Sequence, residues 1–485
     1  MKQELPRELK TKDPIISKPS SIVLEKKAAV ENIFKAYDIR GIVGKGLSKN
    51  VVFDLGLAIG TEAKEKGSQQ IVVAKDGRLS SPELTDALIK GIISTGCNVL
   101  DIGLLPTPLL YFVSHYSDGR SGVMVTGSHN PANYNGLKIV IHKETLAGDR
   151  IQQLKKRIED EDYITEKLGK IEQNNSCTEE YIGTVCEDIK LKKSLKIVID
   201  CGNGAAGDLA PKLFKALGCE VIELFCEIDG NFPNHHPDPS KAENLKDIIE
   251  AVKTHQADIG LAFDGDGDRL GVIDSAGNII WPDRQMMVFA KQVLAGKPAA
   301  EIIYDVKCSA NLAKQIKKHG GRPLMWKTGH SFLKEKMRET GAALAGEMSG
   351  HIAFQDRWFG FDDALYAGAR LLEILAKDGR DSQTLFADYP DSINTPEIII
   401  NMAEGENFSF MEELTKTINF PNAKIIDIDG LRIEFEDGWA LVRASNTTPS
   451  ITVRFEADTE ASLVKIQKRI KHVMGEIKQD IDFSF

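Results

Sequence analysis

The segment Ile197-Val-Ile-Asp200 is a short apolar run that ends in a carboxylate and leads into a glycine-containing loop and then a helical pattern. The runs Ile71-Val-Val-Ala-Lys-Asp76 and Ile302-Ile-Tyr-Asp305 share this design, and domain-sized lengths of chain separate the three. Short apolar strands that alternate with longer amphipathic stretches are typical of βα units around a parallel or mixed sheet. The sequence therefore predicts an α/β fold with three related domains.

The two ends of the chain follow other patterns. Residues 1–30 are polar, contain three prolines and show no sustained apolar period, which predicts an N-terminal extension. Near the other end, Leu431-Arg-Ile-Glu-Phe435 and Trp439-Ala-Leu-Val-Arg443 read as strands, and an amphipathic helix should begin at about Glu460. This pattern favours a smaller α+β domain. We place the domain limits at residues 31–176, 177–278, 279–390 and 391–485.

The composition restricts the class of protein. Hydrophobic residues make up 42% of the 485 residues and charged residues 27%, which is typical of a globular chain. A net charge of −10 argues against a nucleic-acid-binding surface, and no apolar run is long enough to cross a bilayer. The charged N-terminus lacks the apolar region of a secretory signal, and the seven cysteines form no CxxC pair. We expect a cytoplasmic protein with reduced thiols.

The segment Val123-Met-Val-Thr-Gly-Ser-His-Asn-Pro-Ala-Asn-Tyr-Asn-Gly-Leu-Lys-Ile139 runs from a strand through a loop of small polar residues into a second strand. A serine hydrolase would require G-x-S-x-G, but Thr126 and Asn130 occupy the glycine positions around Ser128. Taken alone, the loop favours an ordinary turn hydroxyl, because serine and asparagine are common in turns.

The segment Phe263-Asp-Gly-Asp-Gly-Asp-Arg269 places three carboxylates at alternate positions, separated by glycines. Such a loop can curl so that the carboxylates converge on one hard cation, and without a cation they would repel each other. An EF-hand is excluded, because its sixth position would be Arg269 and its twelfth Ser275. Few protein ligands combined with phosphate oxygens suit magnesium.

Two further loops carry polar groups after predicted strands. Gly346-Glu-Met-Ser-Gly-His351 combines a carboxylate and a hydroxyl, which suits the vicinal hydroxyls of a sugar and equally suits a turn with satisfied side chains. Arg443-Ala-Ser-Asn-Thr-Thr-Pro-Ser450 gathers hydroxyls, an amide and an arginine around backbone N–H groups. This second loop is a candidate phosphate site, since arginine can bind a phosphate through two hydrogen bonds.

One motif points to a different class of enzyme. Gly202-Asn-Gly-Ala-Ala-Gly207 follows a predicted strand, precedes a helical pattern and has Glu223 about twenty residues further on, which is formally a dinucleotide-binding fingerprint. An NAD-linked oxidoreductase is therefore the second hypothesis. It leaves the acidic segment and the two polar loops unexplained, and glycine-rich βα turns are also common for packing reasons.

The four loops, in this order, resemble those of the α-D-phosphohexomutase superfamily, most closely its bacterial phosphomannomutase/phosphoglucomutase branch. The resemblance extends to Phe34-Lys-Ala-Tyr-Asp-Ile-Arg-Gly41, Lys75-Asp-Gly-Arg-Leu-Ser80 and Lys327-Thr-Gly-His-Ser331, and so covers nearly everything after the extension. It implies four domains around a central cleft: three related α/β domains with mixed sheets, and a C-terminal α+β domain.

The resemblance also implies roles for individual residues. Ser128 would carry the phosphoryl group and would bind Mg²⁺ together with Asp264, Asp266 and Asp268. The catalytic group would be completed by His129, Lys138, Arg269 and His330, with His330 and Lys138 as candidates for proton transfer. Residues implied to bind the substrate are Tyr37, Arg40, Lys307, Thr328, Glu347, Ser349, Arg443, Ser445, Asn446 and Thr447.

The implied reaction moves phosphate between C1 and C6 of a hexose through a 1,6-bisphosphate, with glucose 1,6-bisphosphate as activator. The form Gly-Glu-Met-Ser-Gly-His favours mannose and glucose phosphates as substrates over the phosphoglucosamine alternative. The expected partner is a hexose phosphate, with no nucleic acid and no membrane, and the expected state is a monomer or weak homo-oligomer. A non-catalytic sugar-phosphate binder is a third hypothesis.

Overall fold

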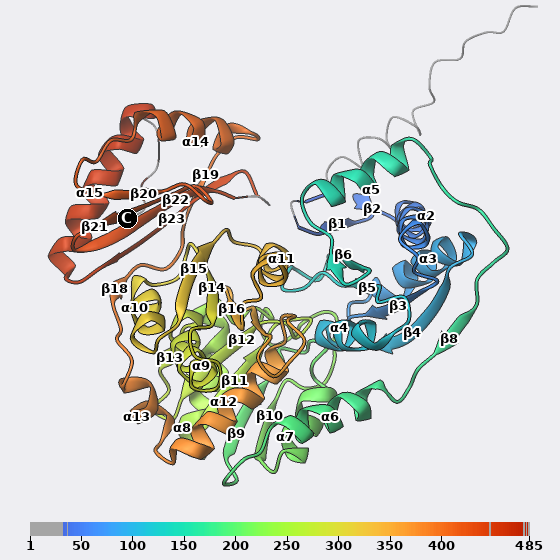
Figure 1. The fold of residues 1–485 in the computed structure, drawn as a ribbon, viewed down its shortest axis with the longest axis horizontal. Coiled ribbons are helices and arrows are strands. Elements are labelled where there is room, and N and C mark those ends of the chain that lie inside the picture. Colours follow the sequence, from blue (N-terminus) through green and yellow to red (C-terminus); the bar gives the residue numbers. More distant parts are fainter. Residues whose placement is uncertain (1–32, 36, 446–447, 479–480, 482, 484–485) are drawn as a thin grey trace, which may run out of the picture.

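A computed structural model describes residues 33–35, 37–445, 448–478, 481 and 483. The predicted extension at residues 1–30 therefore lies outside the described residues, as do Asn446 and Thr447 of the predicted phosphate loop. Four β-sheets, each with its own helices, follow one another along the chain (Figure 1). We number the four parts of the chain that contain them domains I to IV.

Domain I contains an eight-stranded mixed sheet in the order β2-β1-β6-β5-β3-β4-β8, with β7 paired to β6. Helices α2 and α3 pack tightly because Gly56 and Gly91 meet at their crossing, where an added Cβ would approach Leu88 O and Phe53 O within 2.4 and 2.3 Å. The elements are β1 (Ile39–Val43), β2 (Gly46–Leu47), α2 (Lys49–Glu65), β3 (Gln70–Lys75), α3 (Ser81–Ser94), β4 (Asn98–Leu104), α4 (Thr107–Tyr116), β5 (Gly122–Val125), β6 (Tyr134–Ile141), β7 (Glu144–Thr145), α5 (Asp149–Glu159) and β8 (Ile171–Gln173).

Domains II and III contain smaller mixed sheets, in the orders β10-β9-β11-β12-β13 and β15-β14-β16-β17. The elements of domain II are α6 (Cys177–Asp188), β9 (Lys196–Asp200), α7 (Leu209–Ala216), β10 (Glu220–Leu224), η1 (Ala242–Leu245), α8 (Lys246–His255), β11 (Ile259–Phe263), β12 (Leu270–Asp274) and β13 (Ile279–Ile280). Those of domain III are α9 (Pro282–Gly296), β14 (Glu301–Asp305), α10 (Ala310–Lys318), β15 (Arg322–Trp326), α11 (His330–Thr340), β16 (Leu344–Gly346), β17 (Ile352–Phe354), α12 (Ala364–Asp378) and α13 (Ser382–Ala387).

The first three sheets repeat one strand pattern. The predicted strands β3, β9 and β14 each pair in parallel with two neighbours, and one of those neighbours (β5, β11 or β16) pairs with an antiparallel return strand. Ser128 lies in the β5–β6 turn, the three aspartates in the β11–β12 turn, and Glu347 with Ser349 in the β16–β17 turn. The repeat predicted from sequence therefore places three candidate loops at equivalent positions.

Domain IV has the predicted α+β character, with a sheet in the order β18-β23-β22-β21-β20 and β19 paired to β23. The terminal helix begins at Glu460 as expected, and the Thr459 hydroxyl caps it by accepting from the backbone N–H of Ser462. The elements are β18 (Ile393–Asn394), β19 (Ile398–Asn401), α14 (Glu406–Thr417), β20 (Lys424–Ile426), β21 (Leu431–Phe435), β22 (Gly438–Ala444), β23 (Ser450–Ala457) and α15 (Glu460–Ile477).

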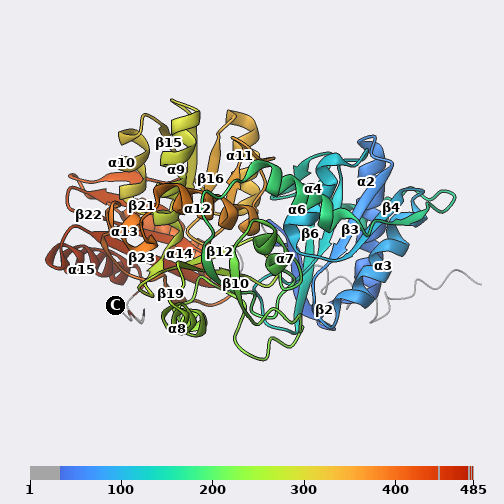
Figure 2. The same cartoon turned by 90° about the horizontal axis from the view of Figure 1, so that it is seen from below.

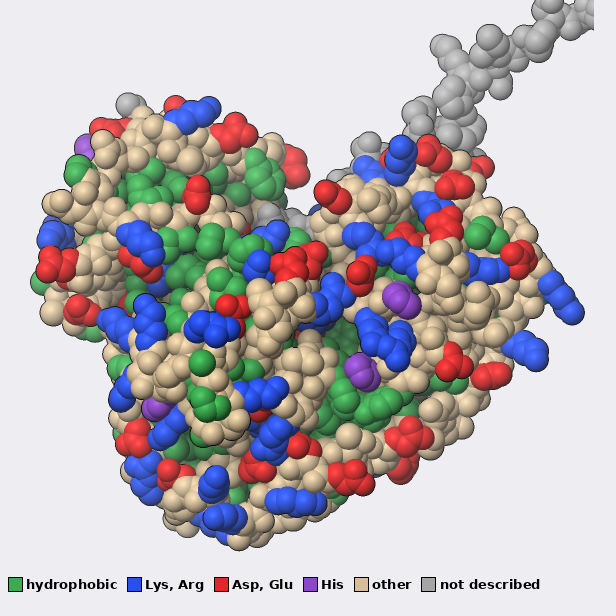
Figure 3. Space-filling model, viewed as in Figure 1, with side chains coloured by type: hydrophobic (Ala, Val, Ile, Leu, Met, Phe, Trp, Pro, Cys, Tyr) green, Lys and Arg blue, Asp and Glu red, His purple; other side chains and the backbone are tan. Residues whose placement is uncertain are grey.

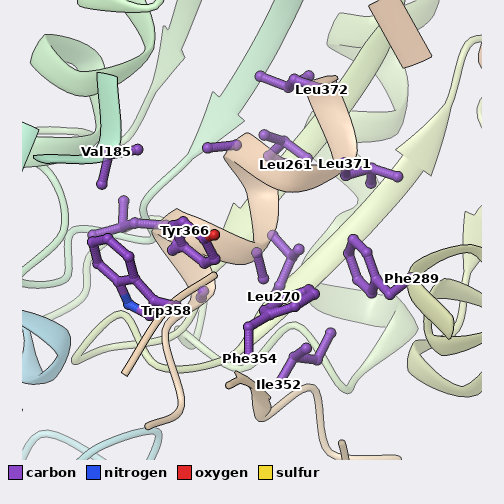
Figure 4. Close-up of a cluster of buried hydrophobic side chains, with 14 of the residues drawn as sticks. Val185, Leu261, Leu270, Phe289, Ile352, Phe354, Trp358, Tyr366, Leu371 and Leu372 are labelled. Carbon is purple, nitrogen blue, oxygen red and sulfur yellow. The ribbon is translucent and has the colours of Figure 1, made fainter. Parts of the chain in front are cut away.

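The hydrophobic cores do not follow the domain limits. One continuous cluster joins domains II and III and one face of the domain I sheet, while domain IV has a separate core. Figure 4 shows the centre of the shared cluster, where Tyr366 of α12 lies near Trp358 and Phe354 of domain III, with Leu261 and Leu270 of domain II close by. Sequence analysis predicted separate domains and did not indicate this shared core.

The two views show how the four domains are arranged. Domain IV lies on one side and domain I on the other, and domains II and III form the base between them (Figures 1 and 2). Within the described residues, no helix is both long enough and apolar enough to span a membrane.

Candidate active site

A cleft of about 1350 Å³ is lined by residues of all four domains. The space-filling view shows the notch between domain IV and domain I, with lysine and arginine side chains nearby (Figure 3). The three aspartates lie beneath the surface of the cleft and are fully buried. The predicted residues that line it are Tyr37, Arg40, Ser128, His129, Lys138, Arg269, Lys307, Thr328, His330, Glu347, Ser349, Arg443 and Ser445.

Ser128 occupies a constrained position at the junction of domains I and II. Its φ of +49° lies in the left-handed region, which is uncommon for a residue with a side chain. The backbone N–H donates to Thr126 Oγ1 at 2.8 Å, and the hydroxyl donates to Asp264 Oδ2 at 3.2 Å. His129 Nδ1 lies 3.3 Å from the same hydroxyl. The predicted nucleophile and the first predicted metal ligand are therefore in direct contact.

Gly265 allows this close approach between the two loops. An added Cβ would lie 2.5 Å from the Ser128 carbonyl oxygen, so a side chain at this position would collide with backbone. Domain I also contacts the acidic loop through Thr107, whose backbone N–H donates to Asp266 O at 2.8 Å and whose hydroxyl donates to the Asp266 carboxylate. The acidic loop is thus fixed against domain I from two sides.

Arg78 was not among the predicted site residues, but its side chain binds the backbone of the serine loop. Its side chain is fully buried and ion-pairs with Asp76, with Nε 3.1 Å from Oδ2. The guanidinium donates to four backbone carbonyl oxygens: those of Ser128 (2.6 Å), Asn130 (2.6 Å), Pro131 (2.6 Å) and Tyr134 (3.1 Å). One arginine therefore supplies hydrogen-bond donors to four backbone carbonyls of the turn that carries the predicted nucleophile.

The acidic loop forms a buried group of three carboxylates whose oxygens lie within 4.8 Å of one another. Lys138 Nζ donates to Asp266 Oδ2 at 2.6 Å and also to Asp268 Oδ2. Asp266 Oδ1 and Asp268 Oδ1 are buried and accept no hydrogen bond from the described residues. Buried acceptors without donors are costly, and an oxygen-preferring cation would satisfy them. The donor set therefore fits the metal site that the sequence predicted.

The charges in this group shift its pKa values in different directions. Burial raises the pKa of Asp264, with a further increase from the neighbouring Asp266 charge. Burial would also raise the pKa of Asp266, but the Lys138 ammonium outweighs it and the net shift is downward. For Lys138, burial is outweighed by Asp266 and Asp268, so its pKa is raised and the ammonium form is retained. Lys138 and Asp266 therefore hold each other ionised beside Ser128, whereas burial and the Asp266 charge raise the pKa of Asp268.

A second buried group joins the acidic loop to the β16–β17 turn. His330, the first residue of α11, places Nδ1 2.8 Å from Asp362 Oδ2, and Lys334 Nζ lies 2.6 Å from Asp362 Oδ1. His351 stacks on His330 with 4.8 Å between ring centroids, and its Nδ1 lies 3.0 Å from Asp362 Oδ2. Arg269 Nε donates to His351 Nε2 at 3.0 Å. This connects the predicted catalytic arginine with His330 through buried side chains.

Two residues of this group, His351 and Asp362, were not among the predicted site residues, although His351 ends the motif at residues 346–351. His351 lines the cleft and lies 3.5 Å from Asp268 Oδ1, so it touches both the acidic loop and the Asp362 group. Its place in the motif was an available signal. Asp362 follows the short strand β17 at a distance along the chain, and no local pattern marks it.

The predicted sugar-binding residues lie together at the end of β16. Glu347 is buried, and burial raises the pKa of its carboxyl group. Its Oε2 accepts from Ser349 Oγ at 3.2 Å, and its Oε1 accepts from the backbone N–H of Gly329. Thr328 precedes that glycine, and its hydroxyl donates to Asp305 Oδ2 at 3.2 Å. Glutamate and serine thus share one edge of the cleft.

Two cations predicted to bind the substrate, Lys307 and Arg443 of the phosphate loop, each pair with a carboxylate of domain IV. Lys307 Nζ lies 2.7 Å from Glu397 Oε1, and Arg443 forms a two-point pair with Asp429 at 3.1 and 3.2 Å. Ser445 Oγ accepts from the backbone N–H of Thr448 at 3.3 Å. Asn446 and Thr447, predicted for the same loop, lie outside the described residues.

The remaining predicted residues, Tyr37 and Arg40, come from the start of domain I. Tyr37 packs edge-on against His330, with ring centroids 6.2 Å apart, and burial raises the pKa of its hydroxyl. Arg40 Nη1 donates to Asn130 Oδ1 at 3.1 Å, and its guanidinium pairs with Asp38. Domain I therefore contributes a second segment to the wall of the cleft.

Other parts of the protein pack directly against the glycines of segment 202–207. An added Cβ at Gly207 would lie 2.1 Å from Cys226 O, and one at Gly204 would lie 2.8 Å from Gly265 O. Glu223, the acidic residue of the formal fingerprint, pairs with Lys215 at 2.6 Å. These glycines allow close backbone packing behind the acidic loop, which removes the main support for the NAD-linked hypothesis.

Comparison with known proteins gives the same assignment for four successive segments between residues 31 and 473. Models of phosphoglucomutase/phosphomannomutase domains match in order: α/β/α domain I at residues 31–165, α/β/α domain II at 179–277, α/β/α domain III at 281–392 and the C-terminal domain at 397–473. Three repeated sheets and a fourth domain around one cleft are the architecture of the phosphohexomutases.

Individual relatives cover nearly the full length of the chain. A phosphomannomutase/phosphoglucomutase of Pseudomonas aeruginosa is 51% identical over 94% of this chain and 98% of its own, and a phosphoglucomutase of Neisseria gonorrhoeae is 53% identical over 91% and 96%. A crystal structure of a phosphoglucomutase/phosphomannomutase family protein from Burkholderia thailandensis is 50% identical, with a TM-score of 0.89 over 94% of this chain and 99% of that one. The chain belongs to the phosphoglucomutase/phosphomannomutase family of the α-D-phosphohexomutase superfamily.

Proposed function

We propose that this protein interconverts the 1- and 6-phosphates of mannose and of glucose, using a phosphoserine at position 128 and a hexose 1,6-bisphosphate intermediate. The observation that carries the proposal is the contact of Ser128 Oγ with Asp264 at 3.2 Å, in a cleft that also contains Glu347 and Arg443. Relatives named phosphomannomutase/phosphoglucomutase and phosphoglucomutase, at 51–53% identity, support both sugars.

The reaction consists of two transfers of the same kind. The phosphoryl group on Ser128 passes to the free hydroxyl of the hexose monophosphate, which loses its proton, and the Ser128 oxygen takes up a proton. The resulting bisphosphate turns end for end within the cleft. Its other phosphoryl group then returns to Ser128, and the isomeric monophosphate leaves. Phosphoryl transfer demands mainly positioning and neutralisation of charge, which a cleft lined by lysine and arginine provides.

Asp264, Asp266 and Asp268 are the residues that would hold Mg²⁺, together with an oxygen on Ser128. Bound there, the cation would neutralise negative charge on the phosphoryl group. Lys138, which pairs with Asp266 and Asp268, keeps a permanent positive charge at the same place. Two buried carboxylate oxygens that accept no hydrogen bond from the described residues support the metal assignment, and few carboxylates combined with a phosphoryl oxygen suit magnesium.

Proton transfer falls to side chains around the Asp362 group. With Nδ1 of His330 donating to Asp362, its Nε2 is left as the basic nitrogen. Burial lowers the pKa of His330 well below its usual value, which keeps the ring neutral, while the Asp362 charge opposes this shift and supports basicity at Nε2. Lys138 is the second proposed residue for proton transfer, although its raised pKa favours the ammonium form and so a role as a fixed positive charge, with His129 and Arg269 as the other proposed catalytic residues. His351, in contact with Arg269 and Asp362, joins this group in the proposal.

Binding of the sugar uses its two ends and its hydroxyls separately. Glu347 and Ser349 would read vicinal hydroxyls in either orientation, and Arg443 with Ser445, Asn446 and Thr447 would hold the phosphate that is not transferred. The other proposed binding residues are Tyr37, Arg40, Lys307 and Thr328. Glucose 1,6-bisphosphate is the proposed activator, because it can phosphorylate Ser128.

The domain limits, the location and the oligomeric state belong to the same proposal. The domain limits at 31–176, 177–278, 279–390 and 391–485 are supported by the separate sheets, although the core is shared. A cytoplasmic location is supported by the seven free cysteines, and a monomer or weak homo-oligomer is the proposed state. A phosphoglucosamine mutase is the second candidate, and the names of the relatives give it less support than the mannose and glucose reactions.

The test is a coupled assay with Mg²⁺ and a trace of glucose 1,6-bisphosphate, offering mannose 1-phosphate, glucose 1-phosphate and glucosamine 1-phosphate in parallel. Comparable turnover of the first two is expected. Ser128→Ala should abolish turnover while substrate binding is retained, whereas Ser117→Ala, a serine of the same domain outside the cleft lining, should behave as the unaltered protein. Activity on glucosamine 1-phosphate alone would contradict the assignment of mannose and glucose phosphates as substrates. An active Ser128→Ala variant would contradict the phosphoserine mechanism.

A further inference from the structure

The turn between β20 and β21 sends one carboxylate to two domains. Asp429 Oδ2 accepts from Arg443 Nε at 3.1 Å and from the backbone N–H of Thr328, in domain III, at 3.0 Å. Its other oxygen, Oδ1, accepts from Arg443 Nη2 at 3.2 Å. A single side chain therefore joins the phosphate loop of domain IV to the segment of domain III that precedes α11.

The placement of this carboxylate is fixed by close packing. Gly430, next to Asp429, has a φ of +72°, and an added Cβ there would lie 2.4 Å from Val442 O and 2.5 Å from Arg443 Cβ. The turn therefore rests directly on the strand that carries the arginine. The side chains of Arg443 and Asp429 are 9% and 14% exposed, so water competes little with their two-point pair.

The domain III end of this connection reaches the sugar-binding turn. Thr328 donates its backbone N–H to Asp429, and the next residue, Gly329, donates its backbone N–H to Glu347. Two consecutive amides are thus held by carboxylates from two different loops. A shift of the domain III segment would disturb the phosphate loop and the sugar-binding turn together.

We propose that Asp429 is a positioning residue that orients the Arg443 guanidinium for the phosphate that is not transferred and fixes it relative to domain III. The pair engages Nε and Nη2, so Nη1 is not part of it. An arginine held at one edge keeps its direction when a phosphate arrives, and less side-chain freedom is lost on binding. This inference rests on the proposed function of the cleft.

The test compares Asp429→Asn with Asp427→Asn, which changes an exposed carboxylate two residues earlier in the same turn. Asp429→Asn should raise the KM for glucose 1-phosphate about tenfold and leave kcat within about twofold, because a phosphate contact made in both ground and transition states affects KM alone. Amide exchange in the 327–330 segment should be faster in this variant. Asp427→Asn should change neither quantity.

A double variant separates positioning from a general structural effect. In an Arg443→Ala background, Asp429→Asn should change KM by less than about twofold, because its partner is already gone. Fully additive effects of Asp429→Asn and Arg443→Ala on KM, or an unchanged KM in Asp429→Asn, would overturn the inference. In either case, mutase turnover by the unaltered protein would still support the proposed function. An unchanged KM in Arg443→Ala alone would overturn the inference together with the phosphate-binding role of that loop.

Discussion

Replacing Arg78 by methionine tests whether the hydrogen bonds of its guanidinium to the backbone fix the position of the serine loop. The substitution keeps most of the aliphatic part of the side chain but removes the guanidinium, which is the partner of buried Asp76 and the donor for four backbone carbonyls. Loss of one partner from a buried ion pair costs about 3–5 kcal/mol. Asp76 keeps hydrogen bonds from Ser81, Thr126 and Gly127, which places the expected loss near the lower value, about 3 kcal/mol.

The consequences can be measured by thermal unfolding and by turnover. A loss of about 3 kcal/mol should lower the Tm by roughly 6–12 °C for a unit of this size. A displacement of Ser128 by about 1 Å should reduce kcat on the order of a hundredfold. Arg380→Met, which removes an exposed arginine paired with surface carboxylates, should leave both quantities nearly unchanged. A Tm within about 2 °C of the unaltered protein together with normal kcat would refute the role assigned to Arg78.

Gly265→Ala should abolish phosphoryl transfer without preventing folding, because its Cβ would lie 2.5 Å from the Ser128 carbonyl oxygen; Gly183→Ala, with open space around it on α6, is the control, and normal turnover by the first variant would contradict the close approach. Removal of divalent cations with EDTA should abolish turnover and lower the Tm, since two buried carboxylate oxygens would lose their partner, and addition of Mg²⁺ should reverse both effects; full activity in EDTA would exclude an essential cation. Glu347→Gln should weaken binding of mannose and glucose phosphates alike by about 1–3 kcal/mol, measured by titration calorimetry, whereas loss for one sugar alone would contradict the shared hydroxyl-binding role.

The candidate loops could be predicted from sequence because their chemistry is local. Three aspartates separated by glycines indicate a cation site before any fold is known, and the structure brings their oxygens within 4.8 Å of one another. The repeated strands β3, β9 and β14 were also recognisable, because each is a continuous apolar run ending in polar residues. The structure adds that the three turns occupy equivalent places in the three sheets.

The supporting residues could not be predicted, because their roles depend on contacts between distant segments. Arg78 holds a turn about fifty residues further along the chain, and Asp362 reaches His330 and His351 from beyond β17. The shared core could not be predicted for the same reason. Helix α12 contacts both β12 and β17, so the apolar surface of this helix covers the sheets of two domains. An amphipathic pattern predicts the helix but does not say which sheets it covers.

The central claim is that the phosphoryl group travels on Ser128, and mass spectrometry of the protein mixed with substrate tests it most directly. The unaltered protein, treated with glucose 1,6-bisphosphate and digested, should carry one phosphoryl group on the peptide that contains Ser128. If this phosphoryl group carries an isotopic label, rapid mixing with excess unlabelled glucose 6-phosphate should transfer the label to glucose 1-phosphate at a rate no slower than turnover, because the group that returns to Ser128 comes from the substrate. Turnover without phosphate on that peptide, or label there that substrate never removes, would contradict the account.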